Sequence, residues 1–195
     1  IFILVLMGMY KWSDRPLGDS ILFRLKNLLG VFVAAVLYFV LAYHLTNLYV
    51  TENHGVEQFI LLDGGVYTQL FWIVQIGLGS LLPLALLYLP STGQSRGWIG
   101  MASLLVIIGG LAQMYVIIIG GQAYPMEMFP GKEVLSSFAD GIVGSYTPSL
   151  PEVILGIGGV ALALAATFVG VRVLRFMPVS LADEAVDPHY AAREA

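Results

Sequence analysis

Long apolar stretches separated by short polar segments are the feature that most restricts what this chain can fold into. A helix needs roughly 20 apolar residues to cross the hydrocarbon core of a bilayer. Because 58% of the 195 residues are hydrophobic and only 11% are charged, a soluble domain is excluded. We expect an all-α, polytopic transmembrane helix bundle. Its full spans are predicted at about 27–50, 67–90, 97–121 and 151–176.

The chain begins inside a shorter apolar stretch, about 1–10, without an initiating Met. We therefore expect this stretch to be a partial span, and residues 1–178 to be the C-terminal part of a larger membrane subunit. Residues 179–195 are acidic and poor in periodic apolar side chains. They are predicted to form a tail that is mobile or held by a partner.

Lys and Arg fall on alternate sides of the spans. Segment 11–26 carries four of them, whereas the next connection, 51–65, has three Asp and Glu residues and no Lys or Arg. The third connection has Arg96, and the last span ends with two Arg residues. Since cytoplasmic loops are enriched in Lys and Arg, we expect a cytoplasmic C-terminus in a bacterial inner membrane. Segments 51–65 and 122–150 would then face outward.

Polar side chains within the spans are few, and each is a functional candidate because it is costly in lipid. His44 and Asn47 are three residues apart, so they share a helix face. With Gln69 and Gln122 they would lie toward the outer side and could line a polar pocket there. We predict no catalytic nucleophile and no metal ligand. The candidates for quinone binding or proton transfer are His44, Asn47, Gln69, Gln113 and Gln122.

A pocket of this kind suits a quinone headgroup. The two carbonyls of a quinone accept hydrogen bonds, its reduction takes up two protons, and its isoprenoid tail requires an apolar slot open to lipid. Histidine suits the proton step because imidazole in water titrates near neutral pH. The alternative is that His44 and Asn47 only hydrogen-bond across helices and hold the bundle together.

Composition restricts the cofactors. The chain has no Cys, so it supplies no thiolate to an iron–sulfur cluster. Of its three His residues only His44 lies in a predicted span, so a haem held by two His within this chain is not expected. The acidic residues of the outer connections, Glu57 among them, are expected to form a solvated rim. Glu152 is expected to favour the start of the last helix, where a carboxylate stabilises the helix dipole.

Two sequence runs resemble a known family. IIIGGQAYPMEMFPG, followed by SYTPSLPEVILGIGGVALALAATFVGVRVLRFMP, is similar to the C-terminal region of NrfD/PsrC-type polysulfide reductase membrane subunits. The likeness is strongest over about 109–178. It points to the ten-helix branch, which includes the membrane subunits of the Dsr complex and of hydrogenase 2.

The resemblance implies a haem-free subunit that interacts with menaquinone or ubiquinone. It also implies electron exchange with an extracytoplasmic, ferredoxin-like iron–sulfur subunit, for which segment 122–150 would be the docking surface. The leading hypothesis is therefore the quinone-reactive subunit of a respiratory or sulfur-metabolising oxidoreductase. The alternatives are half of a secondary transporter, suggested by breaks within the spans such as Pro83, and a purely structural membrane anchor.

Overall fold

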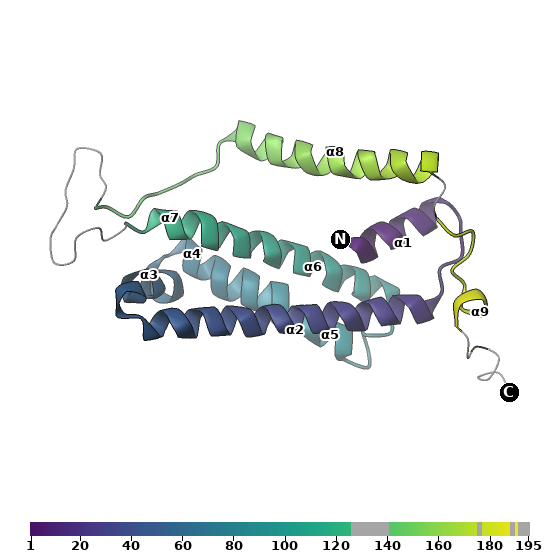
Figure 1. Ribbon diagram of the computed structural model, residues 1–195, viewed down its shortest axis with the longest axis horizontal. Coiled ribbons are helices and arrows are strands. Elements are labelled where there is room, and N and C mark those ends of the chain that lie inside the picture. The colour runs from purple at the N-terminus through teal and green to yellow at the C-terminus, as the bar shows by residue number, and fades with distance from the viewer. Residues whose placement is uncertain (126–140, 175–176, 188–189, 191–195) are drawn as a thin grey trace.

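Helices form the framework of the described chain, and most of them run along one common direction (Figure 1). The computed structural model describes residues 1–125, 141–174, 177–187 and 190. Within those residues there is no β-strand, and four helices are long and apolar enough to cross a membrane. The prediction of an all-α, polytopic transmembrane helix bundle is confirmed. The four helices are Asp19–Tyr49, Val66–Tyr88, Arg96–Ala123 and Leu150–Leu174.

The first full span is α2 (Asp19–Tyr49), an unbroken α-helix. Three short helical pieces then reverse the chain. The first two pack against α2, and the third packs against the second and against the start of the next span. They are η1 (Thr51–Asn53), α3 (His54–Gln58) and the π-helix η2 (Phe59–Asp63).

The second full span changes its helix type along its length. It comprises α4 (Val66–Gln69), the π-helix η3 (Leu70–Leu81) and α5 (Leu82–Tyr88). Pro83 lies in the first turn of α5, two residues after the end of the π-helix. Since proline has no backbone N–H to donate, an irregular helix is expected at this position.

The third full span is similarly composite. It comprises α6 (Arg96–Tyr115), the π-helix η4 (Val116–Gly120) and α7 (Gly121–Ala123). π-Helical turns are rare and are found frequently at functional sites.

The second and third full spans meet most closely at two glycines, Gly79 of η3 and Gly109 of α6. A Cβ atom on either one would collide with the backbone of the other. Small residues allow such close approach of helices in a membrane, where no hydrophobic drive brings helices together. Buried apolar side chains continue the packing toward both ends of the bundle. They include Val40, Phe71 and Val116 toward one end and Leu22, Leu87 and Ile99 toward the other.

The last span, α8 (Leu150–Leu174), contacts the other described helices little, and none of its residues is buried. Its closest attachment is to α1 (Phe2–Trp12). The rings of Trp12 and Phe168 are 4.5 Å apart between centroids, and the Arg172 guanidinium lies 5.3 Å from the Trp12 ring. Figure 1 shows α8 approaching α1 near one end and running apart from the bundle beyond it.

The start of α8 is capped as its sequence predicts. The Glu152 carboxylate accepts hydrogen bonds from the Ser149 backbone N–H, at 2.7 Å, and from the Tyr146 hydroxyl, at 3.0 Å. A carboxylate in the first helical turn stabilises the unpaired N–H groups there. The hydrogen bond from the Tyr146 hydroxyl to Glu152 raises the pKa of that hydroxyl above its usual value. Much of the preceding segment, which was predicted to face outward, lies outside the described residues, at 126–140.

The tail after α8 is held by its own chain over residues 177–187. The Arg15 guanidinium donates hydrogen bonds of 3.1 Å to the carbonyls of Met177 and Pro178. Leu17 and Leu181 pair as an isolated parallel bridge. The expectation of a mobile or partner-held tail is therefore wrong for this stretch.

Asp183 then completes the attachment by capping the start of α2. Its carboxylate accepts hydrogen bonds from the backbone N–H groups of Asp19, at 3.1 Å, and Ser20, at 2.9 Å. These N–H groups have no partner within their own helix. The carboxylate that satisfies them comes from a segment more than 160 residues away in the sequence.

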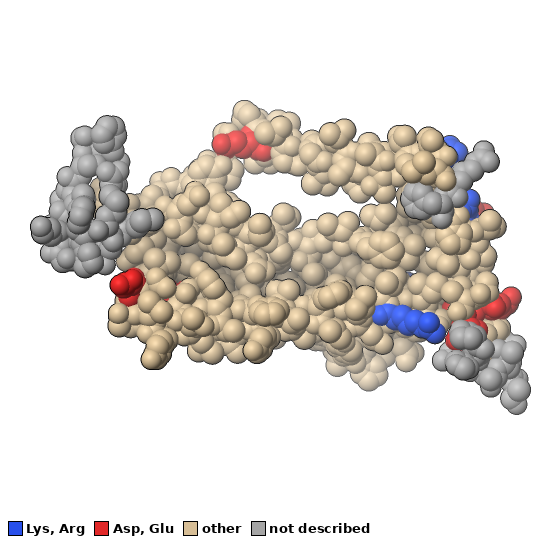
Figure 2. Space-filling view, in the orientation of Figure 1, with Lys and Arg blue, Asp and Glu red and all other residues tan. Residues whose placement is uncertain are grey.

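The Lys and Arg side chains of the described residues gather at one end of the bundle, whereas Asp and Glu occur at both ends (Figure 2). We call one the basic end, because it holds every Lys and Arg among the described residues. The other, the acidic end, is formed by the connection between α2 and α4 and by the start of α8. The connections that were predicted to be cytoplasmic thus lie together. The residues of the basic end are Lys11, Arg15, Arg24, Lys26, Arg96 and Arg172.

Candidate functional site

A buried carboxylate joins two of the predicted site residues at the acidic end. Glu57 of α3 is buried. One of its oxygens lies 2.6 Å from Nδ1 of His44, and the other accepts a hydrogen bond of 2.8 Å from the Asn47 side-chain amide. Asn53 extends the cluster by donating to the Asn47 carbonyl oxygen at 3.4 Å. We call His44, Asn47 and Glu57 the His–Glu cluster.

The local structure explains how the cluster forms. His44 and Asn47 occupy one face of the last turns of α2, as their spacing predicts. The reversal through η1 and α3 then brings Glu57 back against that face. The expectation that Glu57 belongs to a solvated rim is wrong, because the short helix α3 packs inward instead of following the surface.

Aromatic rings enclose the imidazole of His44. The rings of Tyr43 and Phe71 meet it edge to face, with centroids 5.2 Å and 4.8 Å away. The His44 side chain is 13% exposed and that of Glu57 is 1% exposed. In such surroundings little water weakens the interaction between the two groups, and losing either partner would leave a polar group without its hydrogen bond.

The hydrogen bonds also define what the imidazole is able to do. When Glu57 is ionised it accepts a hydrogen bond, so Nδ1 of His44 carries the proton and Nε2 has a free lone pair. Nε2 has no hydrogen-bond partner among the described residues. A carboxylate that orients an imidazole in this way prepares its other nitrogen to accept a proton.

The other predicted site residues lie apart from this cluster. Gln69 and Gln122 are exposed, and Gln113 is half-buried on α6. Gln75 of η3, which the sequence reasoning did not single out, is only 5% exposed. Gln75 and Gln113 line the same cavity between α2, η3 and α6.

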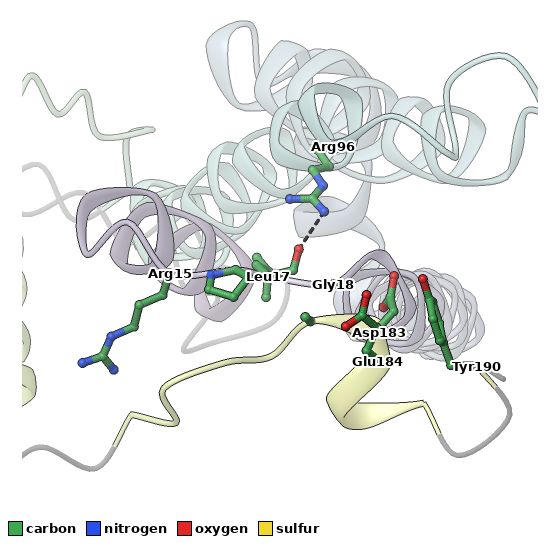
Figure 3. A pocket seen from close by; sticks show the side chains of 9 residues that line it. Arg15, Leu17, Gly18, Arg96, Asp183, Glu184 and Tyr190 are labelled. Atoms are coloured by element: carbon green, nitrogen blue, oxygen red, sulfur yellow. Dashed lines mark hydrogen bonds between the residues drawn. The ribbon is translucent and has the colours of Figure 1, made fainter.

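A larger hollow lies at the basic end, where the tail meets the link between α1 and α2 (Figure 3). It has a volume of about 400 Å³ and is open to the surface. Both of its Arg side chains and Asp183 bind their own chain. Arg96 donates to the carboxylate of Asp19 and to the carbonyl of Leu17, each at 2.7 Å. Arg15 and Asp183 are likewise engaged. This hollow is best explained as part of the contact between the tail and the link that joins α1 to α2.

Metal-binding groups are not assembled in the part of the chain that the structure describes. No cluster of three or more His, Asp or Glu side chains occurs there with a geometry that could hold a metal ion.

The four spanning helices and their sparse, paired polar groups define a multi-pass integral membrane protein. A family model described as polysulphide reductase, NrfD, matches residues 1–126. The chain belongs to this family, and the resemblance predicted from its sequence is confirmed. The match lies mostly before the segment 109–178, where the likeness was expected to be strongest.

Two curated proteins are similar to the chain. One is the Hdr-like menaquinol oxidoreductase integral membrane subunit of Archaeoglobus fulgidus, 29% identical over 181 residues, which are 91% of this chain and 45% of that protein. Another is the C subunit of the selenate reductase of Mesobacillus selenatarsenatis, 31% identical over 135 residues, which are 69% of this chain and 30% of that protein. The chain thus spans less than half the length of either relative. No solved structure gives a significant match.

Proposed function

We propose that this chain belongs to the quinone-interacting membrane subunit of a multisubunit oxidoreductase. In this proposal the subunit exchanges electrons between a membrane quinone pool and an iron–sulfur partner protein, and the His–Glu cluster handles protons. The observation that carries the proposal is the pairing of His44 with the fully buried Glu57 at 2.6 Å. Membership of the NrfD family supports it, as does the name of the menaquinol oxidoreductase relative.

Bound quinol would supply the electron and proton chemistry, because its oxidation releases two electrons and two protons. The residues of this chain would take part by accepting one of these two protons, and the other would leave to water. Nε2 of His44 is the acceptor, and the resulting imidazolium is stabilised by the Glu57 carboxylate on Nδ1. Asn47 holds the second oxygen of Glu57 and so fixes the carboxylate in place. In the direction of quinone reduction, the same groups deliver the proton.

The acidic end is proposed to face outward and the basic end the cytoplasm. The gathering of Lys and Arg at the basic end supports this orientation. The iron–sulfur partner would then bind on the outer side, near the His–Glu cluster, and the C-terminus would lie in the cytoplasm of a bacterial cell. Electron-carrying clusters would reside in the partner, since this chain has no Cys, and no haem is proposed.

The test is the rate of quinol oxidation by the intact complex in native membranes. His44→Gln and Glu57→Gln remove the proton-accepting group and its orienting carboxylate, respectively. We expect each to lower the rate roughly 100-fold, in line with the usual contribution of general acid–base catalysis. His54→Gln and Glu52→Gln are matched controls, because both side chains are exposed and neither touches the cluster.

Unchanged rates in His44→Gln and Glu57→Gln would contradict the proton role of the cluster. An intact complex that copurifies with neither quinone nor an iron–sulfur subunit would contradict the wider proposal. Substrate transport by the purified protein without any redox partner would favour the transporter alternative.

A further inference from the structure

The last span, α8, leaves open space between itself and the rest of the bundle. None of its residues is buried, and a Cβ added to Gly156, Gly158 or Gly159 would meet no atom within 4 Å. Figure 2 shows a gap between α8 and the neighbouring helices. It closes at the basic end, where the rings of Trp12 and Phe168 are 4.5 Å apart. We call this tapering space, bounded by α8, α1 and the rest of the bundle, the α8 wedge.

The wall that α8 gives to the wedge is apolar. The helix has no charged residue between Glu152 and Arg172, and its Ile154, Leu155 and Leu162 are exposed. In a bilayer no hydrophobic drive closes such a space, because lipid tails are as apolar as the side chains. A further helix, about 10 to 12 Å across with its side chains, is too wide for the narrow end. Flexible hydrocarbon chains fit a space that tapers.

Basic side chains gather at the narrow end of the wedge. The Arg172 guanidinium lies 5.3 Å from the Trp12 ring, and Lys11 directly precedes Trp12 in the last turn of α1. Arg15 follows on the link after α1, and Figure 3 shows its side chain pointing away from the hollow at the basic end. None of these three cations pairs with a carboxylate within the described chain, although Asp14 is the neighbour of Arg15 in the sequence. The narrow end therefore attracts an anion.

Two of these side chains keep hydrogen-bond donors available. Arg15 donates to backbone carbonyls of the tail through Nη1, and its other N–H groups have no partner among the described residues. The indole N–H of Trp12 likewise donates to no described residue, and this side chain is exposed. Trp side chains are enriched at the level of the lipid headgroups, where one part of the ring meets hydrocarbon and the N–H meets polar groups.

We propose that the α8 wedge binds an anionic phospholipid. Its phosphate lies at Lys11, Arg15 and Arg172, and its acyl chains fill the space between α8 and the bundle. Basic groups between transmembrane helices on the cytoplasmic side bind headgroups of this kind, which agrees with the proposed orientation. A single ligand thus accounts for both the apolar space and the unpaired cations. The inference goes beyond the quinone-linked function and does not depend on it.

The first experiment measures lipid binding to the intact complex by native mass spectrometry. The probes are dioleoyl phosphatidylglycerol and dioleoyl phosphatidylcholine, which share their acyl chains and differ in headgroup charge. We expect the intact complex to retain phosphatidylglycerol more strongly. Lys11→Gln with Arg172→Gln should weaken its binding roughly 30-fold, because two cations near the headgroup are lost. Arg24→Gln is the matched control, since it removes an exposed cation at the same end of the bundle, on α2.

A single variant keeps the attachment of α8 intact. Lys11 makes no hydrogen bond or ion pair with another described side chain, whereas Arg172 contacts the Trp12 ring. Lys11→Gln therefore removes one cation without disturbing the contact between α1 and α8. It should weaken phosphatidylglycerol binding roughly fivefold and leave phosphatidylcholine binding unchanged.

The second experiment locates the lipid. A phosphatidylglycerol that carries a diazirine in one acyl chain is added to membranes containing the intact complex, and labelled peptides are identified by mass spectrometry. We expect the label within residues 2–12 and 162–174, with less labelling in the double variant than in Arg24→Gln. The wild-type map needs no variant, so a variant that fails to assemble does not prevent the test.

Equal retention of the two lipids, or phosphatidylglycerol binding that the double variant leaves unchanged, would overturn the inference. An absence of label from both α1 and α8 would also overturn it and would show that protein covers the wedge. If quinol oxidation by the same complex is normal, the quinone-linked function stands while the lipid site fails. Specific lipid binding without quinol oxidation would give the reverse result.

Discussion

The two ends of the bundle each hold a carboxylate and a basic side chain at nearly the same distance, in opposite surroundings. His44 and Glu57 lie 2.6 Å apart with side chains 13% and 1% exposed, whereas Arg96 and Asp19 lie 2.7 Å apart with side chains 48% and 49% exposed. Water and salt screen the exposed pair, so its net contribution to stability is small. The enclosed pair loses its hydration, so each partner depends on the other.

Contact distance alone therefore does not distinguish a purely structural contact from a functional site. At the basic end, charged groups bind backbone carbonyls and N–H groups and hold the tail in place. At the acidic end, Glu57 leaves one imidazole nitrogen of His44 without a partner among the described residues. A buried acid–imidazole pair with a free nitrogen is equipped for proton exchange, and four mutational predictions test how far the two ends differ.

The largest expected effect on stability comes from Glu57→Ala. It leaves His44 and Asn47 enclosed without their common acceptor, so the free energy of unfolding should fall by roughly 3 kcal/mol. The measurement is chemical unfolding of the purified protein in detergent. Glu52→Ala, an exposed acid in the same connection, should change the value by less than about 0.5 kcal/mol. Equal effects of the two substitutions would mean that Glu57 is not buried in the folded protein.

Next in size is the helix contact that lies between the two ends. Gly109→Ala places a methyl group against the backbone of Gly79, which should cost about 1 to 3 kcal/mol of unfolding free energy. The neighbouring Gly110→Ala meets only open space and should be neutral or slightly stabilising. A neutral Gly109→Ala would show that the spans do not touch there.

A smaller effect is expected where the tail caps α2. Asp183→Ala removes the acceptor for the N–H groups of Asp19 and Ser20, at a cost of about 1 kcal/mol. Amide hydrogen exchange at these two residues should accelerate about fivefold. Glu184→Ala, the adjacent exposed acid, is the control. Unaltered exchange in Asp183→Ala would indicate that the tail is detached in solution.

The smallest effect is expected for the exposed pair. A double-mutant cycle of Arg96→Ala and Asp19→Ala should give a coupling free energy of about 0.2 to 1 kcal/mol that shrinks as salt is added. The same cycle on His44 and Glu57 should give a larger value that salt barely changes. A salt-independent coupling for Arg96 and Asp19 would remove the contrast between the two ends.

The membrane fold could be predicted because its cause is local. An apolar stretch of about 20 residues fits the bilayer as a helix whatever surrounds it. The shared face of His44 and Asn47 followed from helical spacing for the same reason.

Glu57 could not be assigned from its own position in the sequence, because its burial depends on how the chain reverses after α2. A usable signal was nevertheless present. His44 and Asn47 need an acceptor on their shared face, and the following connection contains carboxylates within reach of the helix end. Glu52, Glu57 and Asp63 are the acceptors available there, and the inward packing of α3 selects Glu57.

The contrast between Gln69 and Gln75 has a different origin. Gln69 is the last residue of α4, directly before the π-helix η3, and Gln75 lies within η3. In a π-helix the backbone hydrogen bonds join residues five apart in the sequence. The turns are wider than in an α-helix, so faces derived from α-helical spacing are misplaced. Gln75 consequently points into the bundle while Gln69 is exposed.

Infrared difference spectroscopy of the intact complex, recorded between oxidised and reduced quinone, tests the proton role of Glu57 and His44 most directly. The spectrum reports changes in carboxyl and imidazole groups when protons move. We predict bands from both groups in the wild type that disappear in Glu57→Gln and persist in Glu52→Gln. Identical difference spectra for the wild type and Glu57→Gln would contradict the assignment of the buried pair as the group that exchanges protons.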